Sequence, residues 1–315
     1  MGGVTECDVG DETEWGYGRN PRVNRIVIVN RVFVIGSTGR IGREVVAQLE
    51  IRDTAVRALT RDPEAAKFSS KVELVRGDLT SPSSLDAHLD GVDAVFLVWT
   101  APPVSVAQVL ERIAKRVRRI VFLSAPLKTP HPLFQQPNPR RALAEQIERL
   151  IESSGMEWTF LRPGMFAANA LGWWAPQIRA DDVVRWPHLT SPSAPVAESD
   201  IAAIAVRALC DQGHAGAEYV LTGPQSLTQF EQISQIGRAV GRPLRIEEIS
   251  PDEARREFAA ASWSPSVVNM LLDAWAAAIG SAAFVTATFE EITGKPAMTF
   301  QQWAADHAAE FRHSA

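Results

Sequence analysis

The stretch RVFVIGSTGRIG, residues 31–42, sets the fold of this 315-residue chain. The run 32–35 is apolar and mostly β-branched, so it predicts a buried strand that stops at Gly36. Apolar residues then recur at positions 41, 45, 46 and 49, which is the spacing of an amphipathic helix. Between strand and helix, three glycines form a G-x-x-G-x-x-G turn.

This turn has the chemistry of a phosphate site. Gly36 permits a tight turn, Gly39 lets backbone N–H groups approach a pyrophosphate, and Gly42 allows the helix to pack close to the strand. The first N–H groups of the helix add partial positive charge. We therefore expect a dinucleotide here. The predicted contacts are Gly36, Ser37, Thr38, Gly39, Arg40, Ile41 and Gly42.

Short apolar runs alternate with amphipathic segments along the first half of the chain. Runs at 55–60, 72–75, 92–98 and 119–124 predict further strands, and a helix is predicted over 104–116. Asp62 and Pro63 predict another helix start. Apolar strands joined by crossover helices predict an α/β fold, a doubly wound parallel sheet of the Rossmann type. A smaller, mostly helical substrate-binding region is expected after it.

The domain limits and the later helices follow from local signals. We expect a flexible acidic leader at 1–24, the cofactor-binding Rossmann domain at 25–164, and the substrate-binding region at 165–315, with some elements returning to the first domain. The later helix starts are predicted at the N-cap of Ser199 and Asp200 and at two capping boxes, Thr228 to Glu231 and Ser250 to Glu253.

Composition narrows the classes of partner. The net charge is −5 and no broad basic field exists, which disfavours nucleic acid. Without an apolar run of about 18 residues, no membrane span is predicted. The two cysteines form no disulfide framework, and the six histidines are scattered, so no metal site and a cytoplasmic location are expected.

Two positions address the nucleotide half of the predicted cofactor. Arg61 ends the second strand, where an acidic residue would bind the ribose of NAD and an arginine accommodates the 2′-phosphate of NADP. Asp78, followed by Leu79, ends the third strand, where a carboxylate accepts from the adenine amino group. The alternatives are a solvated arginine and an ordinary turn aspartate. We predict NADP(H).

Several blocks together resemble one family. They are VIGSTGRIG (34–42), VRALTR (56–61), GDL (77–79), WTFLRPGMF (158–166) with Asn169, SDIA (199–202) and YVLTGP (219–224). In this order they resemble the NmrA-like, atypical short-chain dehydrogenase/reductase family and cover roughly residues 31–312. The resemblance implies NADP(H), with further cofactor contacts expected at Val98, Trp99 and Phe166, and a monomer or homodimer.

The Tyr-x-x-x-Lys pair of conventional family relatives is missing. The tyrosines are Tyr17 and Tyr219, and neither precedes a lysine by four residues. Aligning Glu145 with the helical glutamate of the family places Pro137 at the tyrosine position and Arg141 at the lysine position. Conventional Tyr-based proton delivery is therefore ruled out. Ser124 and Arg141 are the catalytic candidates, and both also fit cofactor contacts. Their alternatives are a strand-ending serine and an exposed helix arginine.

Nine tryptophans favour an aromatic-lined substrate cleft, with core packing as the alternative for each ring. The predicted substrate contacts are Trp99, Phe166, Asn169, Trp173, Trp174, Trp186 and His188. The leading hypothesis is an NADPH-dependent reductase of a hydrophobic, aromatic or polycyclic ketone or quinone, such as a tailoring ketoreductase of secondary metabolism and antibiotic biosynthesis. The alternatives are a non-catalytic NADP(H) sensor that binds a protein partner, and a non-redox cyclase or isomerase.

Overall fold

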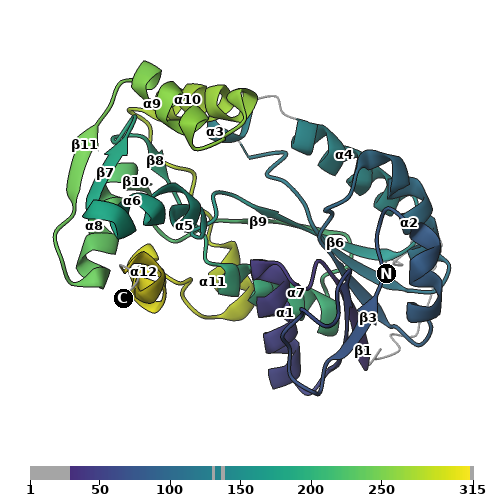
Figure 1. Ribbon diagram of the computed structural model, residues 1–315. Helices are drawn as coiled ribbons and strands as arrows, with labels where there is room; N and C mark the ends of the chain where they lie inside the picture. Colours follow the sequence, from purple (N-terminus) through teal and green to yellow (C-terminus); the bar gives the residue numbers. More distant parts are fainter. Residues whose placement is uncertain (1–28, 130–131, 136–138, 313–315) are drawn as a thin grey trace, which may run out of the picture.

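A computed structural model of the chain describes residues 29–129, 132–135 and 139–312. The predicted leader, Tyr17 and Pro137 lie outside these residues. The described chain forms two lobes side by side (Figure 1). One lobe is built on a seven-stranded sheet, and the other on helices with two short strand pairs.

The first lobe holds a parallel sheet in the order β3-β2-β1-β4-β5-β6-β9. The order of its first six strands is that of the dinucleotide-binding fold, with the reversal between β1 and β4. The predicted doubly wound fold class is confirmed. The strands are β1 (Arg31–Ile35), β2 (Ala55–Thr60), β3 (Glu73–Arg76), β4 (Ala94–Leu97), β5 (Arg119–Leu123), β6 (Glu157–Pro163) and β9 (Ala217–Leu221).

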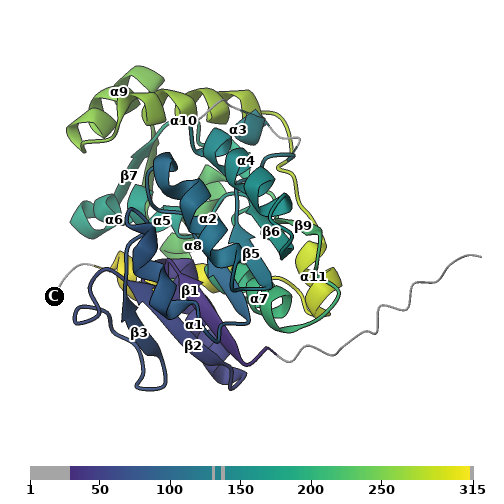
Figure 2. The ribbon, with the colours of Figure 1, turned by 90° about the vertical axis from the view of Figure 1, so that its right-hand side faces the viewer.

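Both faces of this sheet are covered by helices, which explains why the central strands β1 and β4 are nearly continuous apolar runs. Val32 and Val34 pack on one face against α1 (Arg40–Ile51) and α7 (Glu198–Cys210). Phe33 and Ile35 pack on the other face. That face is covered by η1 (Pro82–His88), α2 (Val106–Ala114) and α4 (Pro139–Glu152) (Figures 1 and 2).

The second lobe is mostly helical and has its own core. Its strands pair as β7 with β11, parallel, and β8 with β10, antiparallel. Helix α10 lies over α3 (Figure 2), while α11 returns to α7 and β9. The elements are α3 (Pro132–Gln135), α5 (Asn169–Trp173), α6 (Ala175–Asp181), β7 (Val183–Trp186), β8 (Pro192–Ser193), β10 (Leu227–Thr228), α8 (Gln229–Val240), β11 (Arg245–Glu248), α9 (Pro251–Ala260), α10 (Pro265–Ala278), α11 (Thr288–Thr293), α12 (Phe300–Asp306) and η3 (Ala308–Phe311).

Two predicted helix starts are wrong. The chain after Arg61 makes turns, because the Asp62 carboxylate accepts the N–H groups of Glu64 and Ala65 and β3 begins soon afterwards. Helix α7 begins at Glu198, before the predicted cap, and the carboxylate of Asp200 accepts the N–H of Met298 instead of capping its own helix. For Asp200, the hydrogen bond with the distant Met298 therefore takes the place of the predicted cap.

The two predicted capping boxes are confirmed. Thr228 caps α8 and Ser250 caps α9, each with the glutamate three residues later closing the box. A third box, Thr299 with Gln302, starts α12 and was not predicted. The predicted helix at 104–116 opens with the short 3-10 turn η2 (Pro103–Ser105) before α2.

Candidate cofactor and substrate site

The glycine turn at the end of β1 is held by close backbone contacts. Gly36 adopts φ +85°, and a Cβ on it would lie 2.7 Å from the Cβ of Val98. A Cβ on Gly42 would lie 2.1 Å from the carbonyl oxygen of Gly36. Helix α1 starts at Arg40 with no side-chain cap from Gly39. Its first N–H groups therefore point to the crevice at the carboxyl ends of the strands, which suits an anion.

A cavity of about 390 Å³ opens directly above this turn. Its walls come from the ends of β1, β2, β3 and β4 and from the loops that follow them. Seven of the predicted cofactor residues line it: Gly36, Thr38, Gly39, Arg61, Asp78, Leu79 and Val98. The structure thus brings together residues that are far apart in the sequence at one crevice, where ligands of doubly wound sheets bind.

Arg61 and Asp78 stand on the two walls of this cavity. The Asp78 carboxylate accepts the N–H of Thr80 at 2.8 Å, and this hydrogen bond lowers its pKa. Arg61 is exposed and, among the described residues, forms no ion pair, while its carbonyl accepts from Arg76 at 2.8 Å. The guanidinium is therefore free to fork onto phosphate oxygens.

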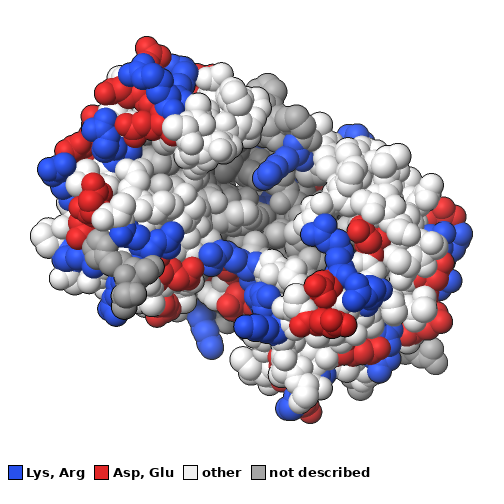
Figure 3. Space-filling view, in the orientation of Figure 1, with Lys and Arg blue, Asp and Glu red and all other residues white. Residues whose placement is uncertain are grey.

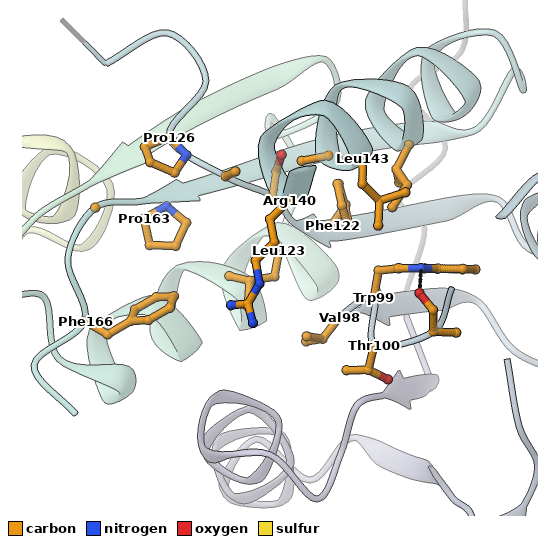
Figure 4. A pocket seen from close by; sticks show the side chains of 16 residues that line it. Val98, Trp99, Thr100, Phe122, Leu123, Pro126, Arg140, Leu143, Pro163 and Phe166 are labelled. Atoms are coloured by element: carbon orange, nitrogen blue, oxygen red, sulfur yellow. Dashed lines mark hydrogen bonds between the residues drawn. The ribbon is translucent and has the colours of Figure 1, made fainter. Parts of the chain in front are cut away.

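A second cavity of about 620 Å³ continues from the first, and the two share Val98, Thr100 and Ala101. Figure 4 shows its lining, which comes from the ends of β4, β5 and β6 and from one face of α4. The lining is largely apolar. It consists of Val98, Trp99, Thr100, Ala101, Phe122, Leu123, Ser124, Ala125, Pro126, Arg140, Leu143, Ala144, Ile147, Pro163, Gly164 and Phe166.

Ser124 brings a hydroxyl to this cavity, and a buried charge network fixes its direction. The hydroxyl donates to Glu148 at 2.6 Å. Glu148 accepts two further bonds from the guanidinium of Arg162, at 3.0 and 2.6 Å, and Arg162 also pairs with Glu218. Arg162 is 2% exposed. The hydroxyl hydrogen of Ser124 is therefore used in the hydrogen bond to Glu148, and the lone pairs of its oxygen face the cavity.

Two opposing effects act on the ionisable groups of this network. Burial lowers the pKa of Arg162, but hydrogen bonds with Glu148 and Glu218 outweigh it and raise the pKa above the usual value. Burial raises the pKa of Glu218, but its bonds with Lys128 and Arg162 bring it below the usual value. A paired and fully hydrogen-bonded buried network of this kind is rigid.

Arg141 does not reach the cavity. Its guanidinium donates to the carbonyls of Phe134 and Leu127, at 2.7 and 2.6 Å, and so ties the loop before α4. The neighbouring Arg140 lines the cavity instead, together with Leu143 and Ala144 on the same helix face. The predicted helix phase is off by one residue, because the packing of α4 on the sheet sets which side faces the site.

Trp99 and Phe166 lie where the sequence predicts, on the walls of the second cavity. The indole N–H of Trp99 donates to the carbonyl of Ala101 at 2.6 Å, which locks the ring beside the entrance from the first cavity (Figure 4). Both side chains offer an aromatic surface to a bound ligand.

Three residues of the glycine loop use their side chains for the fold. The buried Ser37 hydroxyl donates to the carbonyl of Leu59 at 2.7 Å, and Ile41 packs in the core under α1. Arg40 pairs with Glu310 at 3.3 Å, away from Arg61, and does not line the first cavity. Gly42 serves the close packing described above. Contacts from their backbone to a cofactor stay predictions.

The predicted substrate residues of the second lobe are not brought to the second cavity. Trp174 and Trp186 are 0% and 1% exposed and form an aromatic cluster with Trp173, Phe258 and Trp275. This cluster is the core of the lobe, so the packing alternative holds for these two rings. The half-buried Trp173 faces a separate, shallow hollow with Asn169, whose amide contacts the sulfur of Met165.

His188 also lies outside both cavities. It has φ +52°, and burial lowers the pKa of its imidazole. The lining residues of the second cavity that were not predicted include Thr100, Ala101, Arg140, Pro163 and Gly164. The spacing 140, 143, 144 and 147 on α4 was the signal available for Arg140, since residues three and four apart share a helix face.

Two absences apply only to the described part of the chain. Across residues 29–129, 132–135 and 139–312, no three His, Cys, Asp or Glu side chains gather to hold a metal ion. In the same residues, every helix is too short or too polar to span a bilayer.

Comparison with known proteins agrees with this geometry. Residues 36–212 match the model of a family described as NAD(P)H-binding. A (4-alkanoyl-5-oxo-2,5-dihydrofuran-3-yl)methyl phosphate reductase from Streptomyces griseus is 39% identical over 283 residues, covering 89% of this chain and 99% of the relative. An NAD(P)H azoreductase from Xenophilus azovorans is 34% identical over 287 residues, again covering 89% and 99%.

Solved structures share the fold. The Citrobacter sp. triphenylmethane reductase complexed with NADP(H) matches with a TM-score of 0.74 and 19% identity, covering 88% of this chain and 99% of that one. An NADPH-dependent quinone oxidoreductase from Escherichia coli matches with a TM-score of 0.72 and 21% identity, covering 87% and 98%.

Fold, site and relatives define the class as NAD(P)H-dependent oxidoreductases. The chain belongs to the NAD(P)H-binding family, in the NmrA-like, atypical short-chain dehydrogenase/reductase group. The predicted family, enzyme class and nicotinamide cofactor are confirmed.

Proposed function

We propose that this chain is an NADPH-dependent reductase of a flat, hydrophobic quinone or conjugated ketone, with secondary metabolism as its setting. The observation that carries the proposal is the pair of confluent cavities. One has a glycine turn, a helix N-terminus and a free arginine, and the other, about 620 Å³, has apolar and aromatic walls. A volume of this size suits a small polycyclic ligand.

Arg61 supports NADP(H) over NAD(H). It stands at the end of β2, where the ribose of the adenosine lies in this fold, and among the described residues it has no ion-pair partner to displace. Asp78 on the opposite wall is an ionised acceptor for the adenine amino group, because its hydrogen bond with Thr80 lowers its pKa. These two contacts hold the cofactor so that its nicotinamide enters the second cavity past Val98.

The chemistry of the second cavity favours some acceptors over others. When bound, the nicotinamide supplies a hydride. Trp99 and Phe166 position the acceptor between them, and the apolar walls of the second cavity exclude water from the reacting carbon of the acceptor. Ser124 has committed its proton to Glu148, so we infer that it protonates no strongly basic product oxygen. A quinone is then the better acceptor, since its reduced oxygen resembles a phenolate with a pKa of about 10.

Relatives of this chain support such acceptors. One is named for the methyl phosphate of a dihydrofuranone and another for azo compounds, and both kinds of compound contain a conjugated system. The Streptomyces source of the first relative is consistent with a role in secondary metabolism. A non-catalytic sensor is less favoured, because both of these relatives are named as reductases over nearly their whole length.

The test is an absorbance assay for NADPH oxidation with purified protein. Menadione and 1,4-naphthoquinone are compared with the unconjugated ketone 2-tetralone, each with NADPH and with NADH. We expect turnover of the quinones with NADPH, and little turnover of 2-tetralone or with NADH. Tight NADPH binding without oxidation by any acceptor would overturn the proposal.

A matched pair of variants tests the role of Ser124. Ser124→Ala removes the hydroxyl at the cavity. Ser153 lies just beyond the end of α4, and Ser153→Ala removes a hydroxyl that donates to the carbonyl of Leu150. We expect a loss of about 10-fold or less in kcat/KM for Ser124→Ala, because one accepting contact to the ligand is lost while Glu148, which loses the bond from Ser124, keeps its two bonds from Arg162. No change is expected for Ser153→Ala.

A further inference from the structure

One charged side chain stands in the second cavity. Of the 16 described residues that line it, Arg140 is the only ionisable one. It lies in the first turn of α4, and its side chain crosses the cavity toward Leu123 and Phe166 (Figure 4). Leu143, Ala144 and Ile147 continue the same helix face with apolar groups. The guanidinium therefore faces the space that a ligand would fill.

The two carboxylates of α4 that are nearest to Arg140 in the sequence are engaged elsewhere. Glu145 pairs with Arg141 at 3.4 Å. Glu148 takes two bonds from Arg162 and one from Ser124. Within residues 29–129, 132–135 and 139–312, Arg140 itself has neither a hydrogen bond nor an ion pair. Its charge is thus uncompensated by the protein.

Arg140 is exposed to solvent, but its unpaired guanidinium stands beside apolar walls, where it can bind an anion. Electrostatic attraction grows as the surroundings become less polar, and the planar guanidinium presents paired N–H groups that match the oxygens of a carboxylate or phosphate. In Figure 3, basic side chains border the hollow between the two lobes, and the walls of the hollow are mostly uncharged.

We propose that the substrate carries an oxyanion, a phosphate or a carboxylate, which Arg140 binds while the flat apolar body lies between Trp99 and Phe166. This inference rests on the proposed function and narrows its substrate class. The phosphates of the cofactor have their own binding groups, the glycine turn and Arg61, in the first cavity. Arg140 lines only the second cavity, which places its anion on the substrate side.

The experiment uses pairs of acceptors that share one quinone body and differ in the charge of a single substituent. A 2-(hydroxymethyl)-1,4-naphthoquinone is compared with its phosphate monoester, and a carboxymethyl quinone is compared with its methyl ester. Steady-state kinetics with NADPH are measured for wild type, Arg140→Gln, Arg140→Lys and the control Arg149→Gln. Arg149 lies on the same helix, is exposed and does not line the cavity, so its variant matches the change in net charge.

We expect wild type to prefer at least one anionic acceptor over its neutral partner by about 10- to 100-fold in kcat/KM. Arg140→Gln removes that preference, Arg140→Lys keeps part of it, and Arg149→Gln keeps all of it. The dissociation constant for NADPH stays within about twofold in all variants. The better of the phosphate and carboxylate arms identifies the oxyanion.

Three results would overturn the inference. One is equal use of charged and neutral acceptors by wild type. Another is an equal loss of kcat/KM for the charged and the neutral acceptor of a pair in Arg140→Gln. That result would mean that Arg140 stabilises the charge that develops during reduction. The third is a raised dissociation constant for NADPH in Arg140→Gln with unchanged acceptor selectivity, which would assign Arg140 to the cofactor.

A binding measurement separates this inference from the proposed function. The phosphate monoester is titrated into the complex of the protein with NADP⁺, and its affinity is measured by calorimetry without any turnover. Tight binding that Arg140→Gln weakens, in a protein that reduces no acceptor, would sink the reductase proposal alone. Turnover of neutral quinones without binding of either anion would sink the Arg140 proposal alone.

Discussion

The two lobes of the molecule are held together by different kinds of contact. In the nucleotide lobe, apolar side chains pack on both faces of the sheet, and the backbone approaches closely at the glycine turn, as between Gly42 and the carbonyl of Gly36. In the second lobe, packed rings dominate, with Trp186 within 4.9–6.5 Å, centroid to centroid, of five other rings. The first lobe is specified by local sequence, and the second by residues brought together from five segments.

The lobes meet at α7, whose first turn carries two buried carboxylates. Glu198 accepts the N–H of Ala168 at 3.0 Å and the indole N–H of Trp303 at 2.9 Å. Asp200 accepts the N–H of Met298 at 2.8 Å. Because α7 packs on α1, these bonds connect the second lobe to the helix that begins at the glycine turn.

Trp186→Ala is expected to have the largest effect. Removing a ring that is 1% exposed leaves a cavity in the second lobe and should lower the free energy of unfolding by about 3–5 kcal/mol. Urea unfolding followed by circular dichroism measures it. Phe230→Ala in the same lobe removes a ring that is 49% exposed and should change stability by less than about 1 kcal/mol. Equal effects would contradict an aromatic core there.

Gly42→Ala tests the nucleotide lobe. The new Cβ would meet the backbone of Gly36 and Ser37, so the turn must shift, at a cost of about 1–3 kcal/mol and with a large loss of NADPH affinity. Fluorescence titration with NADPH and thermal unfolding measure both. Gly172→Ala is the control, because a Cβ added at Gly172 would have nothing within 4 Å. If Gly42→Ala binds NADPH like wild type, helix α1 does not need this close approach.

Arg61→Gln should reduce the preference for NADPH over NADH by about 10-fold, since one charge-assisted contact to the 2′-phosphate is lost. Affinities for both cofactors are measured by titration in the same buffer. Arg52→Gln, at the far end of α1 where Arg52 pairs with Asp211, should leave the preference unchanged. An unaltered NADPH preference in Arg61→Gln would show that another group recognises the phosphate.

Asp200→Asn should give the smallest effect, visible as a change in pH dependence. Burial raises the pKa of Asp200 to about 6, above its value in the unfolded chain. The folded state therefore holds the proton more tightly, and stability falls as the pH rises from about 4 to 6. Asparagine still accepts from Met298 but does not ionise, so the part of this decline that Asp200 causes should be absent from the variant. Urea midpoints at pH 4, 5, 6 and 7 measure it, and parallel curves for the two proteins would refute the prediction.

Local signals predicted the nucleotide lobe well. The run 31–42 defines strand, turn and helix, because glycine sterics and helical periodicity act over a few residues. Arg61 and Asp78 could be placed at the first cavity, since both end parallel strands and such ends meet at one edge of the sheet. Arg140 was missed in favour of Arg141, because the rotation of α4 about its axis depends on how Ile147 and Ile151 pack on the sheet.

Short-range patterns in the chain were enough to establish that a dinucleotide crevice forms at residues 36–42, that the Tyr-x-x-x-Lys pair is absent, and that tryptophans are concentrated after residue 164. The positions of those rings became clear only in the folded molecule. Trp174 and Trp186 fill a core, while Trp99 alone of the predicted tryptophans lines the second cavity. The reason is physical: backbone geometry is fixed by neighbours in sequence, whereas the surroundings of a side chain depend on residues that reach it through space.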